Sequence, residues 1–134
     1  TPPLKKNPVF LYMSDHFKKP YPFQKDIAVI IDDVIDTKVK GLAAHDSQMF
    51  EWLPWTNGVD VSTIPKGEQE RLVWLKDKWM NRTADESTLE AVKKWYPNVD
   101  ISEVQHVEFF EICEYGKQPT DEEIKEMFPM LGSK

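Results

Sequence analysis

The sequence has little cysteine, little histidine and no long hydrophobic run, and each scarcity excludes a class of protein. The single cysteine, Cys113, excludes an internal disulfide framework and a cysteine-rich zinc module. It lies in an apolar stretch, which favours a buried structural thiol over a reactive one. The apolar run Ile27 to Ile31 is far shorter than the roughly 18 residues that a membrane span requires. The sequence therefore predicts no membrane span.

An excess of basic residues is also missing. The net charge is −6 and the isoelectric point is near 5.1, whereas phosphate backbones are bound by basic surfaces. We therefore expect no nucleic-acid partner. With 40% hydrophobic and 30% charged residues among 134, the composition is that of a soluble globular protein, for which the cytoplasm is the favoured location. Aromatic residues are numerous, so part of the aromatic surface is expected to face a ligand or a partner.

The chain begins Thr1-Pro2-Pro3, without an initiator methionine or a signal-peptide pattern. A strand-like segment follows within a few residues. We therefore expect the chain to be part of a longer protein. The tripeptide Asn81-Arg82-Thr83 matches the glycosylation pattern, but a motif this short is usually accidental.

Three segments have the pattern of strands, and the first two are continuously apolar. Continuous hydrophobicity is typical of a strand covered on both faces, as in a parallel sheet. Residues 17–24 contain two prolines and are predicted to form a loop. The predicted strands are Val9 to Met13, Asp26 to Ile31 and His106 to Tyr115.

Four segments have helical patterns. Asp32 or Asp33 is expected to cap a long helix from Val34 to about Trp52, ended by Pro54. Thr120 is the expected N-cap of a short final helix, with Glu123 at the capping-box position. The two other predicted helices are Glu68 to Asn81 and Asp85 to Tyr96.

The predicted fold class is α/β, with few strands and several helices. Three strands make a poor sheet when at least one is buried on both faces. We therefore expect the sheet to be incomplete on its own, its other strands lying on a preceding segment. Two copies of the chain pairing along exposed edges, as a homo-oligomer, would be another way to cover them.

The segment Asp32 to Gln48 has an acidic start and ends in His45-Asp46-Ser47-Gln48. It resembles the late helix of PIG-L/LmbE-like deacetylases, in which an acidic start, a lysine and a His-x-Ser-Gln ending close one long helix. The likeness extends over about 8–50 and loosely over 107–115. We accordingly divide the chain into a family-like part at 8–53, a helical insertion at 54–104 and a final strand and helix at 105–134.

The resemblance implies a Rossmann-like fold and a zinc-dependent removal of N-acyl groups from amino sugars. In the family, zinc is held by an Ala-His-Pro-Asp-Asp motif and a later histidine, and an aspartate of the first motif is the general base. This chain contains neither motif, so no catalytic residue and no metal ligand is assigned to it. The expected partners are the preceding part of the longer protein, which would hold the zinc, and an N-acylated amino-sugar substrate.

Five residues are candidates for the substrate pocket. Asp15 and His16 directly follow the first strand, where ligands gather in open α/β sheets, although a solvated turn is the alternative. His45 and Gln48 are three residues apart on a helix face that we expect to point inward, as a polar pair at the helix end or toward a pocket. Trp55, between Pro54 and the turn signal Asn57-Gly58, is the tryptophan expected to be exposed.

The three histidines, His16, His45 and His106, have no helical i, i+4 spacing, and no phosphate loop or nucleophile elbow is present. An autonomous metal site is therefore not expected. Two other functions stay open: a non-catalytic module that binds a glycan or a protein, and an unrelated α/β enzyme.

Overall fold

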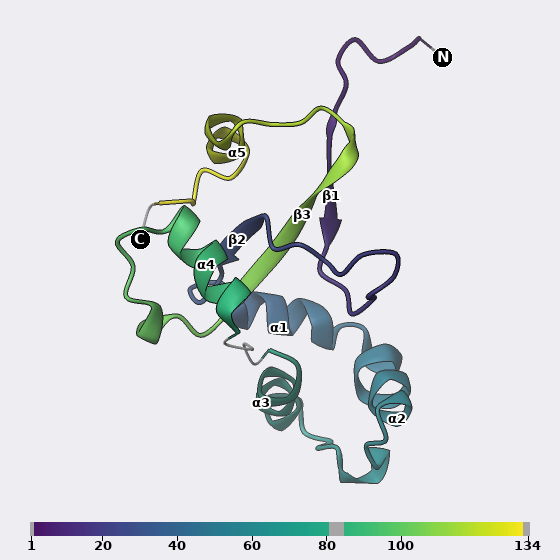
Figure 1. Cartoon of the computed structure of the whole chain (residues 1–134). Coiled ribbons are helices and arrows are strands. Elements are labelled where there is room, and N and C mark those ends of the chain that lie inside the picture. Colours follow the sequence, from purple (N-terminus) through teal and green to yellow (C-terminus); the bar gives the residue numbers. More distant parts are fainter. Residues whose placement is uncertain (1, 81–84, 133–134) are drawn as a thin grey trace. The chain divides into compact units, whose positions relative to one another are not determined.

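The structure, a computed structural model, describes residues 2–80 and 85–132 (Figure 1). Within these ranges the protein is mixed α/β, with one three-stranded sheet and five α-helices. The described residues form two compact units, one from 2–30 with 85–132 and one from 31–80, and each is described by itself. The tripeptide Asn81-Arg82-Thr83 lies outside the described residues. The division of the chain into 8–53, 54–104 and 105–134 rests on the family resemblance and not on compact structural units. It therefore stays a prediction.

The sheet unit contains β1 (Val9–Met13), β2 (Ile27–Ile30) and β3 (Val107–Gly116). Their order is β1-β3-β2, so the last strand in the sequence lies in the middle (Figure 1). Both pairings are antiparallel, and Phe110 is opposite Met13 on one side and Ile27 on the other. The three predicted strands are therefore present.

The expectation of a parallel sheet with β1 covered on both faces is wrong. β1 is an antiparallel edge strand, and Phe10 and Met13 are half exposed or more. The physical reason is that β3 is its only strand neighbour among the described residues. β2, in contrast, is buried along its whole length.

Helix α4 (Glu86–Trp95) packs against β2. Its buried face contains Ala91, Val92 and Trp95, at the spacing of one helical stripe. The N-cap is Asp85, whose carboxylate accepts a hydrogen bond from the Thr88 amide at 2.8 Å. The short 3₁₀ turn Ile101–Glu103 follows α4 and leads toward β3.

Helix α5 (Asp121–Met127) begins with the predicted capping box. The Thr120 hydroxyl accepts from the Glu123 amide, and the Glu123 carboxylate accepts from the Thr120 amide at 3.0 Å. Ile124 is buried, and the Phe128 ring lies 5.5 Å from that of Phe110 on β3. The end of the chain is thereby fixed to the sheet. Cys113, also on β3, is buried, as its apolar context predicted.

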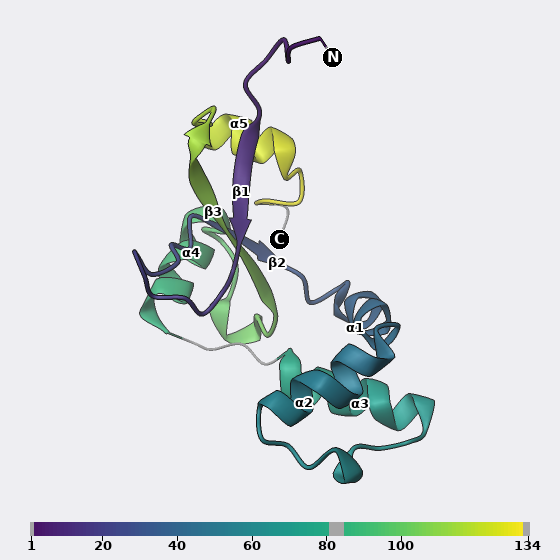
Figure 2. The ribbon, with the colours of Figure 1, turned by 90° about the vertical axis from the view of Figure 1, so that its right-hand side faces the viewer.

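The helical unit consists of α1 (Ile35–Ala43), a π-helical turn (Gln48–Trp52), α2 (Leu53–Thr56), a 3₁₀ turn (Val61–Thr63) and α3 (Glu68–Trp79). Figures 1 and 2 show α1 beside α3, and the two helices are in contact. Lys76 of α3 also pairs with Asp36 of α1 at 2.7 Å. None of the described helices has the length and apolar character to cross a membrane.

The single helix predicted from Val34 to Trp52 is wrong, because the helix is interrupted after Ala43. Its N-cap is Val34, which makes no side-chain capping bond, rather than Asp32 or Asp33. Pro54 lies in the first turn of α2 instead of ending a helix, since proline fits the first turn, where no helical partner for its nitrogen is needed.

Candidate functional site

Two of the expected pocket residues, Asp15 and His16, lie in the exposed segment after β1. The Asp15 carboxylate accepts a hydrogen bond from the Phe17 amide at 2.8 Å, the geometry of a local turn. The turn interpretation of Asp15 is therefore confirmed. Asp15 also lines a hollow with aromatic walls, described below.

His45 and Gln48 are both exposed, so the prediction that they face inward is wrong. The interruption after Ala43 explains the difference, because it breaks the stripe begun by Ile35 and Val39 before it reaches His45. The main-chain carbonyl of His45 instead accepts from the Gln48 and Met49 amides at 3.1 and 2.9 Å. It is therefore the backbone of His45 that organises the following turn.

Trp55 is 70% exposed, as predicted, and Trp52 beside it is 56% exposed. The π-helical turn sets this arrangement. It buries Met49 and Phe50 and leaves Trp52 outside, and α2 then carries Trp55. Two indoles thus lie three residues apart at the surface of one helical segment.

Both indoles line a groove of about 590 Å³ in the helical unit. Its floor is apolar, because Phe50 and Ile64 are buried. Its rim is charged. The lining residues are Phe50, Glu51, Trp52, Trp55, Val61, Ile64, Lys66 and Arg71. The groove therefore offers aromatic faces beside both hydrogen-bond donors and an acceptor.

Arg71, on α3, is the most constrained charged group of the groove. Its guanidinium lies 4.5 Å from the centre of the Phe50 ring, and Nη1 pairs with the Asp46 carboxylate at 2.5 Å. Nε donates to the Pro65 carbonyl at 3.0 Å. Three fixed contacts leave the guanidinium with little freedom, so any ligand in the groove meets it in one position.

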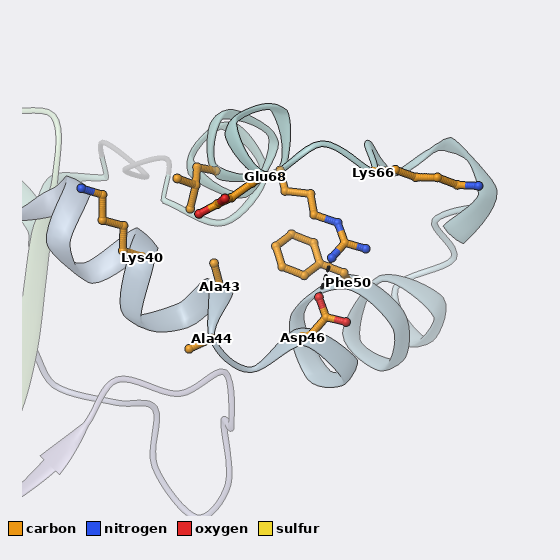
Figure 3. Close-up of a pocket in the computed structure, with 9 residues that line it drawn as sticks. Lys40, Ala43, Ala44, Asp46, Phe50, Lys66 and Glu68 are labelled. Carbon is orange, nitrogen blue, oxygen red and sulfur yellow. Dashed lines mark hydrogen bonds and ion pairs between the residues drawn. The ribbon is translucent and has the colours of Figure 1, made fainter.

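A second hollow of about 410 Å³ adjoins the groove, and both share Phe50, Lys66 and Arg71. Figure 3 shows this hollow, with the Asp46 carboxylate turned toward its arginine partner across the Phe50 ring. Lys40, Ala43, Ala44, Glu68 and Leu72 complete the lining. We treat the two adjoining hollows together as one candidate site, which we call the tryptophan site.

The tryptophan site offers exposed indoles beside charged side chains, which suits the binding of a ligand. Its lining has no serine, cysteine or histidine, and its titratable groups are the carboxylates and ammonium groups of Asp46, Glu51, Glu68, Lys40 and Lys66, together with Arg71. Across residues 2–80 and 85–132, no three His, Cys, Asp or Glu side chains gather as metal ligands. The residues described here therefore do not form a zinc site.

Of the expected residues, only Trp55 belongs to the tryptophan site. Trp52, Lys66 and Arg71 were not predicted from the sequence. The spacing Trp52-x-x-Trp55 was a usable signal for the first, whereas the convergence of α3 on this segment depends on tertiary packing. Comparisons with protein-family models, with curated proteins and with solved structures found no match to this chain.

Proposed function

We propose that this chain is the C-terminal portion of a zinc-dependent hydrolase that removes N-acyl groups from amino sugars, and that it contributes substrate binding. The observation that carries the sugar ligand is the pair of exposed indoles that line one groove with the fixed Arg71 guanidinium. The likeness of residues 8–50 to PIG-L/LmbE-like deacetylases supports the reaction class. The Rossmann-like fold of the whole domain is part of the same proposal.

A sugar fits the tryptophan site for two physical reasons. The apolar C–H face of a pyranose ring stacks on an indole, and Trp52 and Trp55 present theirs to solvent. The hydroxyl and amide groups around the ring need donors and acceptors, which Arg71, Lys66 and Glu51 supply. A volume of about 590 Å³ lies within the usual size range of small-ligand pockets.

The residues present determine which part of the reaction we propose for this chain. Because no metal-ligand group is found among the described residues, this chain is assigned no step of the hydrolysis. The zinc and the general base are proposed to lie in the preceding part of the longer protein. The indoles and Arg71 would then hold and orient the sugar.

The coding sequence upstream of Thr1 gives the first test. The proposal expects an Ala-His-Pro-Asp-Asp motif there, followed by a later histidine motif. The longer protein, purified without chelators, should contain zinc and release the acyl group from an N-acetyl amino sugar. A longer protein without zinc and without turnover would contradict the proposed enzyme class.

A non-catalytic glycan-binding module is the second candidate, and the same groove favours it, since sugar stacking requires no metal. The two functions differ in what the longer protein does. Saccharide binding by the 134-residue chain together with an inactive, zinc-free longer protein would favour the module. Acyl release that weakens on substitution of Trp55 would favour the hydrolase.

The partner proposed for the sheet unit is the preceding segment of the longer protein. β1 is an edge strand with exposed apolar side chains, and such edges pair readily with further strands. In the isolated chain, a second copy would compete for this edge. Analytical ultracentrifugation distinguishes the outcomes, and a strict monomer at high concentration would argue that the edge needs no partner.

A further inference from the structure

A separate hollow of about 310 Å³ lies in the sheet unit, where the segment after β1 faces β3. Four aromatic side chains line it: Tyr12, Phe17, Tyr21 and Phe23. Phe17 and Tyr21 are 77% and 80% exposed, so they cover no core. Tyr12 is also exposed, and its ring belongs to β1. We call this hollow the aromatic–acidic pocket.

Three carboxylates share the pocket, and each has one oxygen already bonded. Asp15 accepts from the Phe17 amide, and Glu111 accepts from the Gln24 amide, both at 2.8 Å. Glu114 accepts from the Tyr12 hydroxyl at 3.4 Å. Each bond holds its carboxylate in place. For the second oxygen of each, the described residues provide no hydrogen-bond partner.

The charge of the lining is strongly one-sided. The lining has three carboxylates and a single ammonium group, that of Lys19, so its net charge is −2. A pocket of this sign attracts cations and repels anions. It does not suit a bare metal ion, because no three acidic or histidine side chains of the described residues lie close enough to share one.

We propose that the aromatic–acidic pocket binds an organic ammonium group. A cation of this kind is too large to need converging oxygen ligands, and it is attracted to the faces of aromatic rings as well as to carboxylates. Aromatic rings and carboxylates both line this pocket. The Tyr12 hydroxyl is neutral at physiological pH even at its ordinary pKa of 10.0, and its hydrogen bond with Cys113 raises that pKa further, to about 12.

This site is independent of the proposed reaction, because it is argued only from the lining of the pocket. An ammonium site would nevertheless affect which form of the sugar the protein binds in that reaction. Removal of an N-acyl group converts a neutral amide into an amine, which is protonated at neutral pH. If the proposed function holds, the pocket would select the product form of the sugar over the substrate form.

The test compares two sugars that differ in charge at one nitrogen. Glucosamine, a cation, and N-acetylglucosamine, which is neutral, are titrated into the 134-residue chain and followed by amide chemical-shift changes. We expect glucosamine to shift the amides of residues 12–24 and 111–114 and the neutral sugar to leave them unchanged. Equal shifts with both sugars, or none with glucosamine, would overturn the proposal.

Variants locate the site. Glu111→Gln with Glu114→Gln keeps the size and one acceptor oxygen of each side chain but removes two charges, and Tyr21→Ala removes one exposed ring. Each should weaken glucosamine binding about two- to fivefold. Glu126→Gln on α5 and Tyr115→Ala on β3 are the matched controls, since both residues are exposed and neither lines the pocket. Loss of binding in the controls as well would show that the shifts do not report on this pocket.

Two further cations distinguish the source of the ammonium group. Tetramethylammonium tests a quaternary headgroup, and putrescine tests a polyamine. Preference for glucosamine over both assigns the pocket to amino sugars, whereas preference for either one assigns it to that class. Potassium chloride at the same ionic strength is the salt control. If it displaced glucosamine, tetramethylammonium and putrescine equally and itself produced the same amide shifts, the proposal of an ammonium site would fail.

Discussion

The indole nitrogen of Trp95 donates a hydrogen bond to the main-chain carbonyl of Asp26 at 2.8 Å. The carboxylate of the same Asp26 accepts from the Ile112 amide, also at 2.8 Å. One residue at the start of β2 therefore connects helix α4 with the central strand β3. Trp95 is only 2% exposed, and its hydrogen bond to Asp26 is partly buried.

Trp95→Phe tests how much the hydrogen bond from Trp95 to Asp26 contributes to stability. Phenylalanine retains most of the buried ring but cannot donate to the Asp26 carbonyl. We expect the free energy of unfolding to fall by about 1–3 kcal/mol, the cost of leaving a buried acceptor unsatisfied. Urea denaturation measures the change. Trp55→Phe is the control, because at 70% exposure it should change stability by less than about 0.5 kcal/mol.

Local signals in the sequence were sufficient for several elements. The capping box at Thr120 and Glu123, the stripe of Val92 and Trp95, and the positions of all three strands follow from nearest-neighbour chemistry. The direction of strand pairing did not follow. An apolar run such as Val9 to Met13 shows that both faces are apolar, but it does not show which neighbour lies beside the strand.

Asp85 should make the stability of the chain depend on acid. Its hydrogen bond with Lys25, followed by the bonds from Thr88, holds the pKa of Asp85 well below its ordinary range. A lowered folded-state pKa contributes stability above the unfolded-state value of about 3.9, which is lost as the pH falls toward the folded-state pKa. We expect part of the unfolding free energy to be lost below about pH 5.

Two substitutions separate the cap from the ion pair. Asp85→Ala removes both and should cost about 1 kcal/mol at neutral pH. Asp85→Asn keeps a capping oxygen and should cost less, because a partly exposed pair with Lys25 contributes little. The stability gap between wild type and Asp85→Asn should close as the pH is lowered. A gap that widens in acid would contradict this account.

Tyr12 and Cys113 make a second titration testable. The Cys113 sulfur and the Tyr12 hydroxyl oxygen are hydrogen-bonded at 3.0 Å, and this bond is the largest cause of a Tyr12 pKa of about 12, against an ordinary value of 10.0. Cys113→Ala should therefore lower the pKa of Tyr12 toward the ordinary value. Carbon-13 labelling of the tyrosine Cζ atoms, assigned with Tyr12→Phe, measures it residue by residue.

His45→Ala should leave stability nearly unchanged. The side chain is exposed, and its turn is held by its own main-chain carbonyl, which alanine retains. We expect a change in unfolding free energy of less than about 0.5 kcal/mol. His45→Pro is the informative contrast, since it removes the amide that donates to the Leu42 carbonyl at 3.0 Å. A large loss with alanine would show that the side chain itself is needed.

Trp52→Ala and Trp55→Ala should each weaken saccharide binding in the tryptophan site. Stacking of a nucleobase on an aromatic side chain contributes about 1–3 kcal/mol, and for a sugar stacked on an indole we expect a comparable loss, roughly tenfold in affinity. Isothermal titration with an N-acetylglucosamine oligosaccharide measures it. Tyr115→Ala, an equally exposed aromatic in the sheet unit, should bind as the wild type does.

The candidate site was only partly visible in the sequence for a geometric reason. Trp55 could be predicted as exposed because a proline and a turn signal flank it. Arg71 could not be connected to it, because fifteen residues separate Arg71 from Trp55 and only the packing of α3 brings the guanidinium onto Phe50. Asp15 was placed correctly at the end of a strand, but its aromatic neighbours on the same loop showed no spacing pattern.

The order of the sheet also determines when it can form during synthesis. β3 lies between β1 and β2 but is made last, so neither outer strand has its partner until residues beyond 107 have left the ribosome. The pairing of Ile27 with Phe110 closes a long stretch of chain. Such distant pairing is slow, and β1 and β2 stay exposed meanwhile. We therefore expect ribosome-bound chains that end before β3 to be far more sensitive to protease in residues 2–30 than the finished protein.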